Sequence, residues 1–435
     1  MARFTMLDGA TTIGGTKLLF EAGDTRLLFD FGLSYATMGA YFEEFLQPRT
    51  AAGLTDYLVT GLLPRLNLYR SDLTALLGQM QPALAGQLAD VGHIDACFIT
   101  HGHVDHTGSL SFLTEAVPLY ATPVTCALLR AVEETQASPG PEDGITDFIL
   151  RPNLGQPNHG RRALLDLPGP VTFPDCRVTP FPVDHSIPGA CAYLVEWDGG
   201  SLVYTGDLRF HGRMGDRTRS SMEALAAAHP DHLIIEGTNL KSDAETQEHG
   251  SAFRRSFTFW SEQDVEEAAL AEVERASGLV MADFGMKDLD RLMTFQRVAH
   301  ATGRRLGILP RDAMLVRRAQ EAGYPTIDLE DPNLALYIKR GGSGIYAKTD
   351  FRQDWIRSTL LRFAGGDPDA LDASDRRDAI QDLLHGACPR IVRAADVAAH
   401  QGDYLLSLGY WDIQELCDVQ PAARSLYIHS SAEAF

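Results

Sequence analysis

The segment 98–110, "FITHGHVDHTGSL", places four potential metal ligands within six positions. These residues follow the apolar run "ACFIT", which predicts a buried strand, and they precede a stretch that favours a helix. A loop that leaves a strand end can direct alternating side chains at one point, so His101 and His103 can share one ion. Asp105 and His106 are displaced along the turn and can serve a second ion. Imidazole and carboxylate are usual ligands of zinc, and the lack of cysteine here argues against a closed structural site.

Further ligands are expected from other strand ends. The segment "PFPVDHSIPGA" offers His185 after one predicted strand, and "SLVYTGDLRFHG" offers Asp207 after another. Each residue alone favours a structural role, but together with the first motif they indicate one site. Asp30 in "LLFDFG" also ends a strand, and we interpret it as a carboxylate that orients a ligand histidine.

Length and charge restrict the possible classes of protein. A chain of 435 residues is too long for one hydrophobic core, which predicts two domains. The net charge of −20 argues against nucleic-acid binding by the whole surface, although it leaves a local basic groove open. No stretch approaches the roughly 20 apolar residues of a membrane span, and the N-terminus has no signal-peptide core. We therefore expect a cytoplasmic protein without membrane association.

The two halves of the chain have different patterns. The first half consists of short predicted strands with two hairpins and a few helices, which indicates a layered α/β domain. Residues 41–90 predict a partly helical insertion with a small core of its own, in preference to a substrate lid. From about residue 241, the predicted strands "GLVMADF", "RRLGILP" and "YPTIDL" alternate with helices. This alternation predicts a second domain with a parallel, doubly wound sheet.

The motifs resemble those of a known superfamily. In order and separation, "LLFDFG", "THGHVDHTG", "DHSIPGA" and "YTGDLRFHG" look like the first four motifs of the metallo-β-lactamase superfamily. The stretch "LIIEGTNL" resembles motif A of the β-CASP branch, which holds RNA-processing nucleases similar to ribonuclease J and the cleavage-and-polyadenylation endonuclease. The resemblance implies an αββα metallo-β-lactamase sandwich over residues 1–240. It also implies an inserted, Rossmann-like β-CASP domain over residues 241–435.

The resemblance also implies a role for each motif residue. The implied ligands are His101, His103 and His185 for a first zinc ion, and Asp105, His106 and a bridging Asp207 for a second. Asp105, Asp207 and Glu236 would be the catalytic carboxylates. Glu236 would orient a histidine of motif B, which protonates the leaving group.

The implied reaction is the hydrolysis of RNA phosphodiester bonds by a hydroxide that two zinc ions activate. Manganese is an alternative, because these ligands accept both metals. Glutamate in motif A favours RNA over DNA as the partner, and a homo-oligomer is possible. Beside Asp207, the basic run of Arg209, Arg213, Arg217 and Arg219 suggests a track for RNA phosphates, with Arg209 and Arg213 as substrate-binding residues. A solvated loop is an equally good interpretation of this run.

Two family motifs are missing from the sequence. The histidines of motifs B and C should follow the second domain, but the chain stops at Phe435 after the predicted strand "SLYIHSS". His385, His400 and His429 are the candidate substitutes, and none lies in a Ser/Gly-rich loop after a returning strand. We expect a shortened form of a longer nuclease rather than a short protein with weakened catalysis. The alternatives are a non-catalytic RNA-binding or scaffold subunit and a small-molecule metallohydrolase of the lactonase or thioesterase kind.

Overall fold

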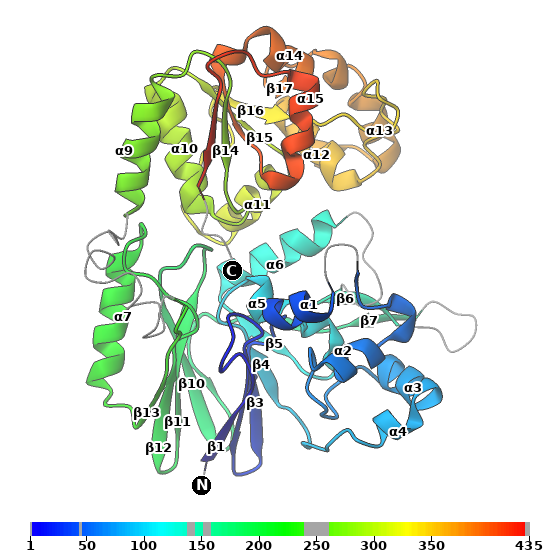
Figure 1. Cartoon of the computed structure of the whole chain (residues 1–435), viewed down its shortest axis with the longest axis vertical. Helices are drawn as coiled ribbons and strands as arrows, with labels where there is room; N and C mark the ends of the chain where they lie inside the picture. Colours follow the sequence, from blue (N-terminus) through cyan, green and yellow to red (C-terminus); the bar gives the residue numbers. More distant parts are fainter. Residues whose placement is uncertain (1, 43–45, 137–143, 151–157, 239–260, 431–435) are drawn as a thin grey trace. The chain divides into compact units, whose positions relative to one another are not determined.

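The computed structural model describes residues 2–42, 46–136, 144–150, 158–238 and 261–430 (Figure 1). The chain forms two compact units. The first comprises Met1–Phe210 and Met214–Phe257, and the second comprises His211–Arg213 and Thr258–Phe435. The domain boundary predicted at residues 240 and 241 lies outside the described residues. Among the helices that the structure describes, none has both the length and the apolar character that crossing a membrane requires.

The first unit contains two β-sheets. The order of strands is β1-β2-β3-β4-β5-β8 in one sheet and β13-β12-β11-β10-β9 in the other. The two predicted hairpins are confirmed, since β2 pairs with β3 and β11 with β12 in antiparallel register. The strands are β1 (Ala2–Asp8), β2 (Lys17–Ala22), β3 (Thr25–Phe29), β4 (Ala96–Phe98), β5 (Leu119–Ala121), β8 (Leu164–Asp166), β9 (Val171–Thr172), β10 (Cys176–Pro182), β11 (Cys191–Trp197), β12 (Gly200–Tyr204) and β13 (His232–Ile234), with a separate ribbon of β6 (Asp147–Leu150) and β7 (Asn158–Arg161).

The two sheets pack face to face, and helices cover their outer faces. Between the sheets, Phe29 and Phe98 of one sheet contact Tyr193 of the other, with ring centroids 5.5–5.6 Å apart. Leu225 packs on the outer face of the second sheet from its own helix, α7, which runs beside that sheet in Figure 1. The expected αββα sandwich is therefore confirmed. The helices are α1 (Tyr35–Tyr41), α2 (Thr55–Thr60), α3 (Ser71–Met80), α4 (Pro82–Ala85), α5 (Val104–Thr107), α6 (Pro123–Thr135) and α7 (Gly215–Ala227).

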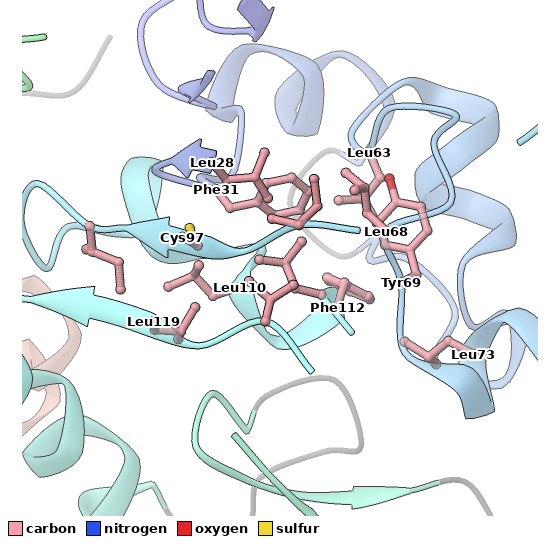
Figure 2. Packing of buried hydrophobic residues seen from close by; sticks show 14 of the residues in the cluster. Leu28, Phe31, Leu63, Leu68, Tyr69, Leu73, Cys97, Leu110, Phe112 and Leu119 are labelled. Atoms are coloured by element: carbon pink, nitrogen blue, oxygen red, sulfur yellow. The ribbon is translucent and has the colours of Figure 1, made fainter. Parts of the chain in front are cut away.

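The insertion over residues 41–90 does not have a core of its own, which corrects the prediction from sequence. Leu63, Leu68 and Leu73 belong to the same buried cluster as sheet residues such as Leu28 (Figure 2). Helices as short as α2, α3 and α4 are marginal in isolation because nucleation is costly, so their stability comes from packing on the outer face of the first sheet. The insertion thus completes one helical layer of the sandwich.

The second unit has a six-stranded parallel sheet in the order β17-β16-β15-β18-β14-β19, as a doubly wound fold requires. Helices α14 and α15 cover one face of it, through Val397 and Val419. The prediction of a strand at "YPTIDL" is wrong, because the strand is β16, five residues further on. Pro325 cannot donate to a sheet ladder, whereas every residue of β16 is buried. The elements are β14 (Val280–Asp283), β15 (Arg305–Ile308), β16 (Leu334–Tyr337), β17 (Ile391–Val392), β18 (Tyr404–Ser407), β19 (Leu426–His429), α9 (Glu262–Val273), α10 (Leu289–Ala301), α11 (Pro310–Glu321), α12 (Asp354–Phe363), α13 (Ala373–Ala379), α14 (Ala394–Ala399) and α15 (Leu416–Val419).

Candidate metal centre

Three strand ends in the first unit supply the candidate ligands. β4 ends at residue 98, β10 at residue 182 and β12 at residue 204. His101, His185 and Asp207 each lie three residues beyond the end of their strand. Because β10 and β12 both run antiparallel to β11, their carboxyl ends lie at the same edge of the sheet. The short helix α5, which follows β4, adds the remaining residues of the first motif.

Three histidine rings converge on one point. His103 Nδ1 lies 3.1 Å from His101 Nε2 and 3.0 Å from His185 Nε2. Nitrogens held about 2.0–2.1 Å from one tetrahedral ion are separated by about 3.3 Å, so this spacing fits a single cation. Burial lowers the pKa of His185 to about 4, which leaves its ring neutral at pH 7. A neutral imidazole is the form that a metal ion requires.

A second group of donors adjoins the first. Donor atoms of His101, His106 and Asp207 lie within 4.8 Å of one another. One oxygen of Asp207 is 3.3 Å from His106 Nε2, and the other is 3.7 Å from His185 Nε2. The Asp207 carboxylate therefore lies between the two groups. Burial tends to raise the pKa of Asp207, but hydrogen bonding and charge at His106 outweigh it and lower the pKa to about 2.

Asp105 stands at the edge of this second group. Its Oδ2 lies 3.7 Å from His106 Nε2, and its side chain is partly exposed. Burial raises the pKa of the Asp105 carboxyl, and the neighbouring Asp207 carboxylate raises it further, while His106 lowers it. A cation between these groups would remove the repulsion of the two carboxylates. Asp105 is not a member of the group formed by His101, His106 and Asp207, and it makes a longer contact with His106 than Asp207 does, so its role as a ligand stays a prediction.

A fully buried carboxylate, Asp30, supports the ligands from beneath. It accepts hydrogen bonds from His106 Nδ1 at 2.8 Å, the Thr100 amide at 2.8 Å and the Tyr204 hydroxyl at 2.7 Å. Burial by itself lowers the pKa of His106, but the Asp30 and Asp207 carboxylates outweigh it and raise the pKa well above its ordinary value. A carboxylate accepts from His106 Nδ1, so one ring proton lies on Nδ1, and a cation facing Nε2 would replace the second proton that the raised pKa places there. Sequence reasoning missed Thr100 and Tyr204 as partners of Asp30, although each is the first residue of a motif.

Glu236 holds the loop that carries Asp207. Its carboxylate accepts from the backbone amide of Leu208 at 3.0 Å and from that of Thr238 at 3.3 Å. Its own amide donates to Thr205 Oγ1 at 3.3 Å. The structure thus gives Glu236 a role in fixing the residue next to Asp207. Its predicted contact with a motif B histidine stays a prediction.

The basic run beside Asp207 is engaged in ion pairs. Arg209 Nε donates to Asp184 Oδ1 at 2.9 Å, which braces the residue before His185. Sequence reasoning missed Asp184, for which the dipeptide Asp-His was the available signal. Arg213, within the second unit, donates to Thr294 Oγ1 at 2.6 Å and to Glu266 at 3.2 Å. The phosphate contacts of Arg209 and Arg213 stay predictions. The other two arginines of the run, Arg217 and Arg219, lie on helix α7 and not in a loop.

The three candidate substitutes for the missing histidines all belong to the second unit. His429 ends β19, as the predicted strand "LYIH" requires, and its Nδ1 lies 3.1 Å from Asp283 Oδ2. His385 and His400 are exposed on short turns. His429 thus pairs with Asp283 of the neighbouring strand β14, and this contact joins two strands of the sheet.

Comparisons with known proteins agree with this geometry. The sequence model of the family described as "Beta-lactamase superfamily domain" matches residues 70–277. Ribonuclease J 1 of Streptococcus pyogenes is 26% identical over 228 residues, which cover 51% of this chain and 35% of that protein. Ribonuclease J of Thermus thermophilus is 27% identical over 335 residues, which cover 73% of this chain and 46% of that protein. The chain thus spans less than half the length of these relatives.

One solved structure matches along nearly the whole chain. A protein of unknown function from Enterococcus faecalis superposes with a TM-score of 0.61 at 18% identity, covering 99% of this chain and 88% of that one. This likeness concerns the fold alone. Taken together with the sandwich and the motifs, the family match identifies residues 70–277 as a domain of the beta-lactamase superfamily. The chain is similar to several ribonucleases J, as its resemblance to the β-CASP branch implies.

Proposed function

We propose that the protein is a metal-dependent ribonuclease that hydrolyses RNA phosphodiester bonds. The observation that carries this proposal is the convergence of three imidazole nitrogens within 3.0–3.1 Å, beside a carboxylate that reaches both donor groups. The names of the relatives support RNA as the substrate class. Two zinc ions are the preferred occupants, with manganese as an alternative, because nitrogen and carboxylate donors accept both.

Each residue has a role that follows from its position. His101, His103 and His185 would hold the first ion, while His106 and Asp105 would hold the second with Asp207 between the two. Cations held by these residues would supply a hydrolytic nucleophile and would offset the charge of the phosphate. Asp30 keeps the Nε2 lone pair of His106 directed at the site, and Glu236 fixes the loop behind Asp207. Proton delivery to the leaving oxygen stays assigned to a histidine that Glu236 orients.

The test compares the full chain with its Asp207→Ala variant. After removal of metal by a chelator and reloading with zinc or manganese, bound metal is measured by mass spectrometry and the decay of a labelled RNA is followed by gel electrophoresis. We expect metal-dependent decay by the wild type and a loss to background in the variant. Equal activity in both proteins, or no bound metal in the wild type, would contradict the proposal.

The same assay separates the two alternatives. Tight RNA binding by a metal-loaded protein without any turnover would support a non-catalytic RNA-binding or scaffold subunit. Hydrolysis of thioesters or lactones without RNA decay would support a small-molecule metallohydrolase. The large second unit favours a polymeric substrate over a small one.

A further inference from the structure

Lys17, the first residue of β2, is a fully buried lysine. Its ammonium donates to Asp8 Oδ2 at 3.1 Å and to the carbonyl oxygen of Gly15 at 3.1 Å. Removing a charge from water costs several kcal/mol, and a single carboxylate at this distance offsets that cost only in part. A methionine of similar length would fill the space without the cost. The buried charge therefore indicates a task other than packing.

That task concerns the segment between β1 and β2. Gly14 and Gly15 adopt φ of +79° and +77°, a region that favours glycine. A Cβ on Gly14 would lie 2.9 Å from the Cβ of Asp105, and a Cβ on Gly15 would lie 2.7 Å from the Cβ of Ser34. The segment thus approaches Asp105 more closely than any other residue type would allow, and Lys17 fixes its end by binding the Gly15 carbonyl.

The backbone of Asp105 is held between this segment and the loop after β3. The amide of Thr16, which directly precedes Lys17, donates to the Asp105 carbonyl at 3.2 Å. The carbonyl of Thr16 in turn accepts from the Gly32 amide at 3.1 Å. A Cβ on Gly32 would overlap the Asp105 carbonyl oxygen at 1.5 Å, so the packing leaves no room for adjustment. A shift of the Gly15–Thr16 peptide would therefore move Asp105.

We propose that Lys17 is a positioning residue for Asp105 and hence for the second cation of the centre. The inference rests on the proposed function, because it requires that the site binds two ions. Asp105 is the ligand that most needs such support, because its carboxylate makes the longest contact with His106. Lys17 itself acts through Thr16 and touches neither ion. Removing its ammonium should lower the affinity for the second ion. The affinity for the first ion should not change, because His101, His103 and His185 would hold that ion without Asp105.

The experiment is a metal titration of the full chain. Protein stripped by a chelator is titrated with Co²⁺, whose absorption reports each site, and the stoichiometry of Zn²⁺ is measured after gel filtration. For Lys17→Met we expect the first ion to bind as in the wild type and the affinity for the second to fall about 10- to 100-fold, as for other residues that orient ligands. Asp8→Asn keeps the shape of the Asp8 side chain, which is partly exposed. This variant should also lower the affinity for the second ion, but by a smaller factor than Lys17→Met.

Arg304 provides a matched control in the second unit. It too is a buried cation that donates to backbone carbonyls, those of Ala276, Gly278 and Tyr404. Arg304→Met should lower the melting temperature and leave both ions in place. The inference is overturned if Lys17→Met and Asp8→Asn bind two ions with wild-type affinity, or if both ions weaken equally. A wild type that binds no metal would instead overturn the proposed function itself.

Discussion

The carboxyl ends of the strands in the two units carry polar side chains of opposite arrangement. In the first unit, nitrogens of like kind face one another, as in the 3.0 Å approach of His185 to His103. In the second unit, complementary groups pair. Lys339 lies 2.6 Å from Asp412, and the Tyr337 hydroxyl donates to Glu415 at 2.7 Å. Complementary groups satisfy each other, whereas His103 Nδ1 meets two imidazole nitrogens and has only one proton or one lone pair to offer them, so a shared cation satisfies the cluster better. The comparison shows that side chains of the same kind facing one another indicate a ligand site, whereas the number of polar residues does not.

The largest expected effect comes from removing the ring of His103, which lies next to both His101 and His185. In His103→Ala the remaining nitrogens of His101 and His185 lose their shared neighbour, so the first ion loses one of three ligands. We expect RNA hydrolysis to fall to background and the metal content to fall by at least one ion per chain. His429→Ala, which removes a histidine paired with a carboxylate in the second unit, is the control and should leave the metal content unchanged. Loss of metal in His429→Ala but not in His103→Ala would reverse the comparison.

A smaller effect is expected from the carboxylate beneath the ligands. Asp30→Asn keeps an acceptor for the Thr100 amide but removes the charge that holds the His106 proton on Nδ1. We expect the affinity for the second ion to fall about 10- to 100-fold. Asp283→Asn is the matched change in the second unit, where a carboxylate accepts from the Tyr410 amide. It should cost stability and leave metal affinity intact, as measured by thermal melts and by the same titration.

Most candidate ligands of the first unit could be predicted from the sequence. Its candidate ligands follow strands and lie in compact motifs, so the sequence alone indicates His101, His103, Asp105, His106, His185 and Asp207. Thr100 and Tyr204 were not, because a threonine and a tyrosine at strand ends are common, and only the three-dimensional packing brings them to Asp30. A side chain that acts through another leaves little signal in sequence.

The second unit shows the complementary limit. Alternating strands and helices predicted its parallel sheet, but "YPTIDL" was mistaken for a strand because its apolar residues are those of a strand. Ion pairs such as Lys339 with Asp412 join residues 73 positions apart, and no local pattern announces them. The insertion differs from its prediction for the same reason, since Leu68 belongs to the same buried cluster as Leu28, 40 positions away in the sequence. Local periodicity predicts elements, whereas their partners depend on contacts distant in sequence.

A pH effect of intermediate size sharpens the comparison, because burial has a larger effect on the Asp312 carboxyl of the second unit than the charges around it have. Asp312, near the start of α11, is buried, and burial raises its pKa to about 6, although the amide of Leu309 and the charges of Arg311 and Lys339 oppose this while Asp412 adds to it. The folded state therefore binds its proton more tightly than the unfolded chain, and stability is lost as pH rises from about 4 to about 6. Relative to Asp312→Asn, the wild type should lose about 2 kcal/mol of unfolding free energy across that window. Urea unfolding of both proteins at pH 4 and pH 7 measures the difference, and a constant difference would contradict the raised pKa.

The smallest expected effect concerns the exposed member of a complementary pair. Lys339 is 44% exposed and Asp412 is 8% exposed, so the pair is screened on one side only. A double-mutant cycle of Lys339→Met and Asp412→Asn should give a coupling of about 1 kcal/mol or less, decreasing with added salt. All three variants should keep the wild-type metal content, because these groups satisfy each other and have no need of an ion. If the cycle gave no coupling but either variant lost metal, the pairing in the second unit would not be what distinguishes it from the first.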